Sequence, residues 1–370
     1  MGLPVGRGAE DSEDHTAVRV RTVCGEIASS DLGLSLVHEH IVTDVRQVRA
    51  ASGLITNWEG PSGERAFGPV LAEEASSLRH DPYSVLENCQ LDELGVAVSE
   101  LGAAIAQGVR TVVEPTPEGI GRFPEALRAV SMRTGLQVIM GCGFYVEGAH
   151  PAGLARLSVD DIARHIVDDV QRGVGPDHVR AGVIGEIGVE SFGEGERRVL
   201  AAATRAYCEV GVPLYVHLPA WERIGHAVLD AVESEGGVLG GVVLCHMSPS
   251  GPDEAYQDEL FARGAWLGYD MLGMEGFSYG EGLDCPSEEQ DARAVLSVLA
   301  RGRGGQLLLG SDVFLKCMLK RYGGNGYDYV VGPFSSRLVD LGATKESVEE
   351  LLVGNPERLF VQAALSKGGV

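Results

Sequence analysis

The sequence predicts an α/β protein built as a single (β/α)8 barrel of the TIM type, on two observations. Short apolar segments rich in β-branched residues alternate with longer segments of helical periodicity, which is typical of repeated βα units around a parallel sheet. Several of these apolar segments end in His, Glu or Asp, and in such barrels the carboxyl ends of the strands converge on one face. The chain of 370 residues is long enough for one such barrel, and no second domain is visible.

Eight segments are predicted as barrel strands, because each is a nearly continuous apolar run, as expected for strands buried on both faces. They span residues 34–40, 109–114, 136–141, 181–186, 213–217, 241–246, 264–270 and 306–312. Between them, segments such as 158–173 and 194–211 carry apolar residues at i, i+3, i+4 and i+7, which predicts amphipathic helices around the barrel. We expect a short β-hairpin at residues 18–27, and a long loop insertion after the first strand, at residues 46–92, over the barrel mouth.

The amino-terminal segment and the overall charge narrow the cellular setting and the classes of partner. Residues 1–16 contain no apolar run of the kind that a signal peptide needs, so we expect a disordered leader there and the barrel over residues 17–370. The net charge of -23 would repel nucleic acid and anionic membrane surfaces. The seven cysteines are scattered without a CxxC pair, as in a reduced cytoplasmic protein. A small molecule is therefore the expected partner.

The informative polar residues stand at the ends of predicted strands that are otherwise apolar. In the first strand, the sequence HEH turns His38 and His40 to one side and Glu39 to the other, because side chains alternate along a strand. A single buried histidine is more often a hydrogen-bonded core residue, but the repetition of the pattern at five strand ends favours metal ligands. The predicted ligands are His38, His40, Glu186, His217, His246 and Asp312.

This set of donor atoms predicts the kind of metal centre. Imidazole nitrogens and carboxylate oxygens suit zinc, and manganese, cobalt and nickel accept the same ligands. Six such ligands are more than one tetrahedral site uses. Two divalent metal ions per chain, sharing a bridging carboxylate, therefore fit the sequence better than one.

Together with segments elsewhere in the chain, these strand ends resemble the phosphotriesterase family of the amidohydrolase superfamily. The resemblance runs from TVCGEIASSDLGLSLVHEH through TPEGIGR, MGCGFYVEGAH, AGVIGEIG, YVH, LCH and GSD to RYGGNGYDY and the terminal VGNPERLF. It is closest to the branch called phosphotriesterase-related proteins, which share segments of the GFYV and GVIGEIG type. The likeness also implies a homodimer, although no sequence feature by itself indicates one.

The resemblance implies a role for each predicted ligand. Many members bridge their metals with a carboxylated lysine on strand four, whereas this chain has Glu186 there, as the phosphotriesterase-related branch does, and no lysine nearby. A hydroxide bridging the two metals would attack the substrate, and Asp312 would accept its proton and deliver it to the leaving group. Relatives often carry Asp shortly after the strand-six histidine, where this chain has Ser248, so a contact to His246 is expected to differ.

Residues just past the strand ends are candidates for substrate binding, with loop packing as the alternative interpretation. These candidates are Tyr145, Trp221, Arg223 and Tyr269. Arg223, together with Lys316 and Lys320 after the last strand, favours a substrate that carries an anionic group.

The combined pattern predicts a metal-dependent hydrolase that attacks the carbonyl of a lactone, an ester or an N-acyl amide. A phosphotriester is the alternative substrate within the enzyme class. A metal-stabilised scaffold without turnover is the alternative from a different class. The presence of Asp312 in a complete ligand set favours the enzyme, because a scaffold has no need of a proton-shuttling carboxylate.

Overall fold

Strands and helices alternate along the chain in the computed structural model, which describes residues 18–51 and 68–368. The parallel strands of these residues form a five-stranded and a three-stranded sheet. They are β3 (Ser35–Leu36), β6 (Thr111–Glu114), β7 (Gln137–Met140), β8 (Ile184–Gly188), β9 (Leu214–His217), β10 (Val242–Leu244), β11 (Trp266–Tyr269) and β12 (Leu307–Leu309). Each lies within, or within two residues of, a segment predicted from the sequence, although most are shorter than predicted.

Backbone hydrogen bonds join the two sheets at both edges and close the barrel. At the β7–β8 edge, the amide of Gly182 donates to Met140 O at 2.9 Å, and the amide of Gly185 donates to Cys142 O at 2.7 Å. At the β12–β3 edge, the amide of Asp312 donates to His38 O, and that of His40 to Val313 O, both at 3.1 Å. The second edge places the first and the last strand of the barrel side by side.

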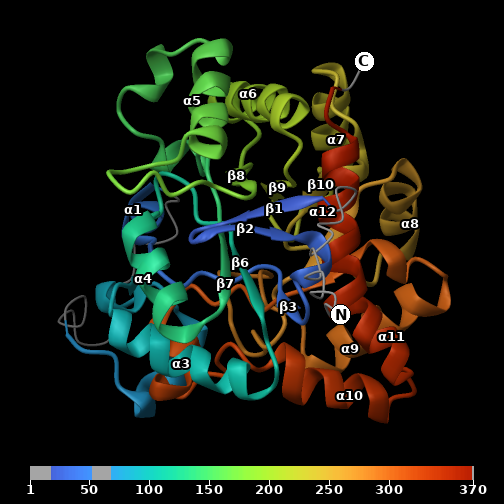
Figure 1. Ribbon diagram of the computed structural model, residues 1–370. Coiled ribbons are helices and arrows are strands. Elements are labelled where there is room, and N and C mark those ends of the chain that lie inside the picture. Colours follow the sequence, from blue (N-terminus) through green and yellow to red (C-terminus); the bar gives the residue numbers. More distant parts are fainter. Residues whose placement is uncertain (1–17, 52–67, 369–370) are drawn as a thin grey trace, which may run out of the picture.

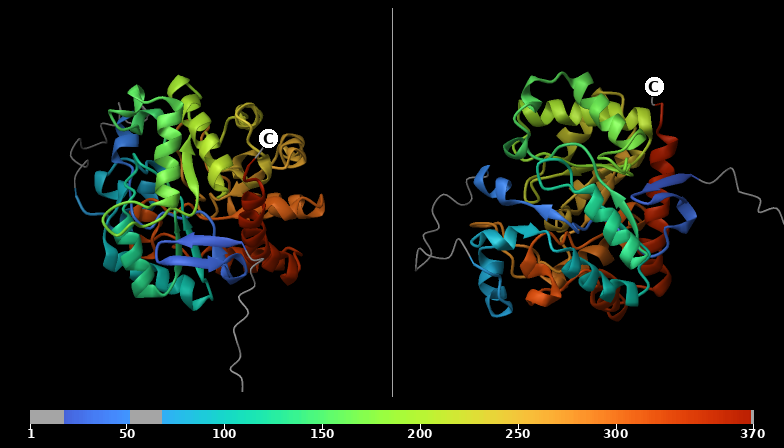
Figure 2. Two further views of the ribbon diagram at one scale, coloured as in Figure 1. Left: turned by 45° about the horizontal axis from the view of Figure 1, so that its top comes forward. Right: turned by 60° about the vertical axis from the view of Figure 1, so that its left-hand side comes forward.

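The helices surround the strands on the outside (Figures 1 and 2). Between the strands they are α3 (Leu94–Ala106), α4 (Pro124–Thr134), α5 (Val159–Gln171), α6 (Glu194–Val210), α7 (Gly225–Ser234), α8 (Glu254–Arg263) and α9 (Glu288–Ala300). After β12 come α10 (Ser335–Asp340), α11 (Lys345–Glu349) and α12 (Asn355–Leu365). The local sequence determines where α5 begins. The side chain of Ser158 accepts the backbone amide of Asp161, and the side chain of Asp161 accepts the backbone amide of Ser158.

Apolar side chains fill one end of the barrel interior and leave the other end to polar residues. We call this apolar cluster the plug, and it includes Val37, Val113, Ile139, Val183, Tyr215, Val243, Cys245, Trp266 and Leu308. The antiparallel pair β1 (Arg19–Thr22) and β2 (Gly25–Ala28) adds Val20 to this cluster and lies beside α12 (Figures 1 and 2). The ring of Tyr215 stands 6.2 Å from that of His38, so the plug forms the floor of the polar site.

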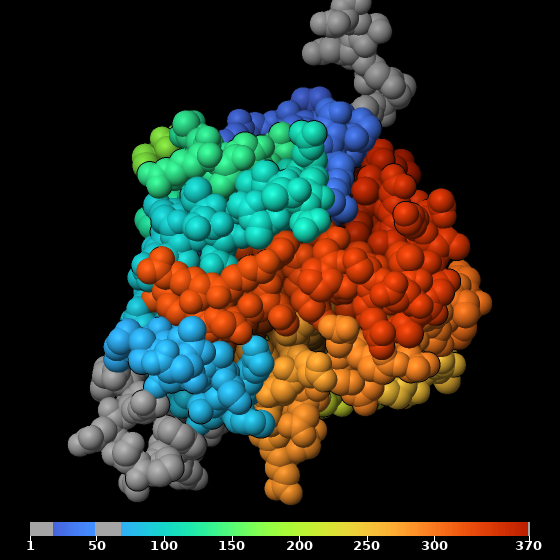
Figure 3. Space-filling view, turned by 90° about the horizontal axis from the view of Figure 1, so that it is seen from below, coloured from blue at the N-terminus to red at the C-terminus, as the bar shows by residue number. Residues whose placement is uncertain are grey.

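The segment between β3 and β6 contains short elements, in the residues that the structure describes. They are β4 (Thr43–Asp44), α1 (Arg46–Ala51), α2 (Ala75–His80) and β5 (Gln90–Leu91), with β4 and β5 paired antiparallel. The guanidinium of Arg79, in α2, donates to Gly323 O at 3.1 Å, and the backbone amide of Ser278 donates to Arg79 O at 2.9 Å. The insertion therefore packs against loops from the carboxyl-terminal half, as seen from below (Figure 3).

Two predictions fall on residues outside those described: the leader at residues 1–16, and the part of the insertion at residues 52–67. Among the described helices, none combines the length and the apolar character that a membrane crossing requires.

Candidate metal centre

The structure brings the six predicted ligands together in the polar end of the barrel. Glu186 and His217 lie within β8 and β9, whereas His38, His40, His246 and Asp312 follow the ends of β3, β10 and β12 by two to four residues. The hydrogen bonds between β3 and β12 continue past the strand ends, so these residues remain fixed to the barrel wall. Five of the six residues are buried, and His217 is partly exposed.

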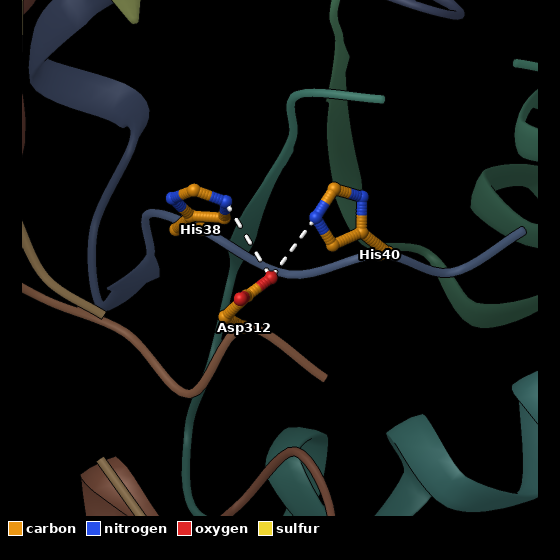
Figure 4. A group of neighbouring side chains, drawn as sticks. All are labelled: His38, His40 and Asp312. Carbon is orange, nitrogen blue, oxygen red and sulfur yellow. Dashed lines mark ion pairs between the residues drawn. The ribbon is translucent and has the colours of Figure 1, made fainter. Parts of the chain in front are cut away.

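His38, His40 and Asp312 form one half of the cluster, which we call the inner triad. Figure 4 shows both imidazole rings facing the carboxylate. Asp312 Oδ1 lies 3.0 Å from His40 Nε2 and 3.6 Å from His38 Nε2. Two imidazole nitrogens and a carboxylate oxygen thus point at a common volume, an arrangement that can hold one cation.

His217 and His246 form the other half, which we call the outer pair. Their facing nitrogens, Nδ1 of His217 and Nε2 of His246, are 2.8 Å apart. Tyr145 reaches the same place, with its hydroxyl oxygen 3.1 Å from His217 Nδ1. The outer pair thus opens toward a phenol and the solvent, whereas the inner triad is enclosed.

Glu186 stands between the two halves and presents one carboxylate oxygen to each. Its Oε1 lies 2.8 Å from His217 Nδ1 and 2.7 Å from His246 Nε2. Its Oε2 lies 3.7 Å from His38 Nε2 and 3.6 Å from His40 Nε2. A carboxylate in this position can ligate two cations at once, one through each oxygen.

Groups behind the imidazoles fix which ring nitrogen faces the cluster. Asp270 lies 3.0 Å from His246 Nδ1 through Oδ1 and 2.8 Å from His38 Nδ1 through Oδ2. The Thr116 hydroxyl donates to Glu114 at 2.7 Å, so its oxygen accepts from His40 Nδ1, also at 2.7 Å. In His246 and His40 the Nδ1 proton is thereby directed away from the cluster, which leaves Nε2 as a lone pair for a metal, and in His38 the Nδ1 atom faces the Asp270 carboxylate.

The electrostatics of the cluster favour positive charge. Burial lowers the pKa of His246, but Asp270 and Glu186 outweigh it and raise that pKa to about 10. Burial likewise opposes the charged form of His38, yet Asp270 and other neighbours raise its pKa well above the usual value. Burial raises the pKa of Glu186, but the imidazoles of His217 and His38 lower it well below its ordinary range. Fixed negative charge that attracts protons will also attract metal cations.

Two members of the cluster hold strained backbone conformations. His246 has a φ of 61° and Asp312 a φ of 44°, in the left-handed region that side chains other than glycine rarely adopt. Such strain persists only where the surroundings impose it, and it concentrates at functional sites. The amide of His246 donates to Asp270 at 2.8 Å, which holds that turn in place.

The donor set fits divalent metal ions by one further observation. His38 Nε2 is buried without a hydrogen-bond partner among the described residues, although it faces two carboxylates. A buried polar atom without a partner is costly unless something else satisfies it. A cation between the inner triad and Glu186 would satisfy this nitrogen.

The residues predicted to bind substrate are only partly brought to the cluster. Tyr145 contacts His217, as described above. The ring of Trp221 lies 5.8 Å from that of Tyr279, and its Nε1 donates to Asp284 O at 3.2 Å. Tyr269 is fully buried, and its hydroxyl donates to Gln257 of α8 at 2.7 Å. The prediction for Tyr269 is therefore corrected: its side chain lies between strand and helix, and its neighbour Asp270 faces the site.

The basic residues that suggested an anionic substrate are engaged by other groups. The guanidinium of Arg223 lies 3.6 Å from Asp253 and donates to two loop carbonyls. The Lys316 ammonium is buried and pairs with Glu87 and Glu93, and Lys320 lies 2.5 Å from Asp328. These basic side chains are therefore already paired with neighbouring groups, and an anionic group on the substrate stays a prediction.

Two tyrosines and a glutamate near the cluster were missed by the sequence analysis. The rings of Tyr83 and Tyr279 lie 5.9 Å apart. Burial raises the pKa of Tyr83, and the charges of Cys89, Asp312 and Glu190 add to the shift. Glu190 lies 3.7 Å from His217 Nε2. None of the three stands at a predicted strand end, so no pattern in the sequence marked them.

Comparison with known proteins gives consistent matches over nearly the whole chain. The model of the phosphotriesterase family matches residues 18–360. The N-acetyltaurine hydrolase of Danio rerio is 30% identical over 346 residues, which cover 92% of this chain and 97% of the relative. A phosphotriesterase-related protein of Nematostella vectensis is 27% identical over 351 residues, covering 92% of this chain and 98% of the relative.

Two solved structures share the fold. A resiniferatoxin-binding protein from Rhodobacter sphaeroides superposes with a TM-score of 0.87 at 45% identity, covering 92% of this chain and 94% of that one. The phosphotriesterase homology protein from Escherichia coli, solved with phosphate in its active site, superposes with a TM-score of 0.74 at 23% identity. The superposition covers 89% of this chain and 99% of the Escherichia coli protein, and at this identity it supports the fold alone.

Proposed function

Since this chain belongs to the phosphotriesterase family, and is therefore a hydrolase, we propose that it uses two divalent metal ions to hydrolyse a carbonyl compound. The substrate class is an N-acyl amide, an ester or a lactone. The inner triad would hold one ion and the outer pair the other. Zinc suits these ligands, as do manganese, cobalt and nickel.

One observation carries the proposal: Glu186 offers a separate oxygen to each half of the cluster. A carboxylate that ligated a cation in only one half of the cluster would need no contact with the imidazoles of the other half. Here Oε1 lies within 2.8 Å of both outer imidazoles, and Oε2 faces both inner ones at 3.6 and 3.7 Å. This arrangement supports a pair of metal ions that share Glu186.

The residues of the chain divide the chemical work. When bound, the two ions would acidify a water molecule toward a pKa of about 7 and polarise the scissile carbonyl. Asp312 is the most exposed member of the inner triad, at 7%, so it is placed to accept the proton of the attacking water. It would then deliver that proton to the departing amine or alcohol. Burial keeps the pKa of the Tyr145 phenol high, so this group remains a neutral donor beside the outer pair.

The relatives favour an amide as the first substrate to test. Several matched relatives are named N-acetyltaurine hydrolases, including that of Danio rerio. The Rhodobacter sphaeroides protein is named for binding resiniferatoxin, which keeps ligand binding without turnover as the alternative to exclude. A phosphotriester remains the alternative substrate for an enzyme.

The test is mass spectrometry for the addition of water across N-acyl amino acids, N-acyl taurines, lactones, esters and phosphotriesters. The protein is reconstituted with zinc or with manganese, and its metal content is measured in parallel. We expect turnover of a carbonyl class that disappears with chelator and in Glu186→Gln.

Three results would contradict the proposal. Turnover of phosphotriesters alone would replace the substrate class. A single metal ion per chain with full activity would remove the bridging role of Glu186. Two bound metals without turnover of any class would favour the binding protein.

A further inference from the structure

Glu39 is a buried carboxylate that the proposed reaction does not use. It lies between His38 and His40 in the chain, and the alternation of side chains turns it away from the metal cluster. It is completely buried. Its Oε1 accepts the amide of Ser311 at 2.8 Å, and its Oε2 accepts the amide of Val313 at 3.1 Å.

The two amides that Glu39 holds are those on either side of Asp312. Asp312 itself has the left-handed φ of 44° that carries its carboxylate toward the imidazoles. Its own amide donates to His38 O, and Val313 O accepts from His40. The β3–β12 contact thus uses the amide at 312, and it leaves the amides at 311 and 313 to Glu39.

Without Glu39, two buried amides on either side of the strained residue Asp312 would lack a partner. Buried amides without partners are avoided in proteins. A carboxylate offers two acceptor oxygens and no donor, whereas the amide of glutamine offers only one acceptor. Accepting both backbone amides therefore requires glutamate rather than glutamine.

We propose that Glu39 is a positioning residue that fixes the carboxylate of Asp312 against His38 and His40 by holding the strained turn from both sides. This inference rests on the role proposed for Asp312. It predicts that Glu39 influences metal affinity and kcat although it touches neither metal nor substrate.

Glu100 supplies a matched control for the test. It is also a buried glutamate whose two oxygens accept two backbone amides, those of Lys320 at 2.8 Å and Arg321 at 2.9 Å. Those amides belong to a loop beyond the cluster, and among the described residues Glu100 makes no hydrogen bond or ion pair with a member of the cluster. Glu39→Gln and Glu100→Gln remove the same kind of contact from two places.

The experiment measures kcat, KM, metal affinity and melting temperature for both variants. We expect Glu39→Gln to lower kcat or metal affinity by roughly 10- to 100-fold, with KM nearly unchanged. Glu39→Gln and Glu100→Gln should lower the melting temperature by similar amounts, but Glu100→Gln should leave kcat and metal affinity unchanged. Equal effects of the two variants on kcat, or no effect of Glu39→Gln, would overturn the proposal.

Two further measurements separate this proposal from the one on which it rests. Hydrogen–deuterium exchange of the peptide around residues 307–315 should be faster in Glu39→Gln, and this readout requires no turnover. If the wild-type protein shows no hydrolysis, exchange and zinc affinity still test Glu39. In Asp312→Asn, adding Glu39→Gln should cause little further loss of kcat, because both changes act through one carboxylate. Additive losses would contradict the proposal, and Glu39→Asp, which keeps the charge but is shorter, serves if the glutamine variant does not fold.

Discussion

The inner triad and the outer pair use the same side-chain chemistry in different surroundings. The side chains of His38 and His40 are 1% and 2% exposed, whereas that of His217 is 15% exposed. The inner triad stands on the seam between the first and last barrel strands, with backbone hydrogen bonds on both sides. The outer pair faces a phenol and the exposed carboxylate of Glu190.

This difference indicates a division of labour. In the enclosed half, Glu39 holds the strained backbone, and Asp270 and Thr116 hold the imidazoles. In the outer pair, His246 is likewise strained and held by Asp270, so His217 is the member that differs. The exposure of His217 makes the outer pair the half that solvent reaches more readily. Glu186 and Asp270 each contact imidazoles of both halves, so a change in one half can reach the other through them.

Removal of the metals is expected to have the largest effect on activity. It should also release the ion of one half before the ion of the other. With excess chelator, activity should be lost completely, and the ion held by the outer pair should leave first because His217 is the more exposed. Metal content and residual activity followed over time check this. Release of both ions in a single phase would show that burial does not distinguish the halves.

Asp312→Asn should have the next largest effect. Asparagine keeps a ligand oxygen but cannot accept a proton, so kcat should fall by about 10²–10⁴-fold while both metals remain bound. Steady-state kinetics and metal analysis of the same preparation provide the measurement. A variant with normal kcat would remove Asp312 from the proton transfer.

Asp270→Asn should weaken both halves at once, since one carboxylate contacts an imidazole of each. We expect metal affinity or activity to fall by roughly 10- to 100-fold. Asp291→Asn is the control, because Asp291 is a comparably buried carboxylate on α9 that is not part of the cluster. A loss confined to one metal site would mean that Asp270 does not couple the halves.

Tyr145→Phe should have the smallest effect and should be confined to the outer half. Loss of one hydrogen bond corresponds to roughly a two- to tenfold fall in kcat/KM. Tyr269→Phe, whose hydroxyl is bound to Gln257 outside the barrel, should leave kcat/KM unchanged. If Tyr269→Phe were the more damaging variant, the assignment of Tyr145 to the site would be wrong.

The strands and the cluster could be predicted from the sequence because barrel strands are apolar until the point at which they reach the site. His217 and His246 each follow an unbroken apolar run, and this makes them visible. The structure brings them together with the other predicted ligands, and ligation itself stays a prediction. The same alternation that placed His38 and His40 could have excluded Tyr269, because Asp270 and Tyr269 point to opposite faces.

The supporting residues could not be predicted in this way. Glu39, Glu114 and Thr116 act through backbone amides or through another side chain, so their role depends on what lies across the barrel. The partners of Arg223 and Lys316 are acidic residues of neighbouring loops, and no spacing in the sequence reveals such pairs. The position of a basic residue near a predicted mouth therefore does not reveal whether its side chain is already paired, and the charge of the substrate stays a prediction.

The inner triad joins residues from the first and the last strand of the barrel, so it combines residues made at the start and near the end of synthesis. Residues 38–40 leave the ribosome early, but Asp312 follows only after most of the barrel has been translated. Glu186, His217 and His246 are available well before it. Until Asp312 has been added, the enclosed half lacks its carboxylate. The inner triad is therefore complete only once the last barrel strand has been made.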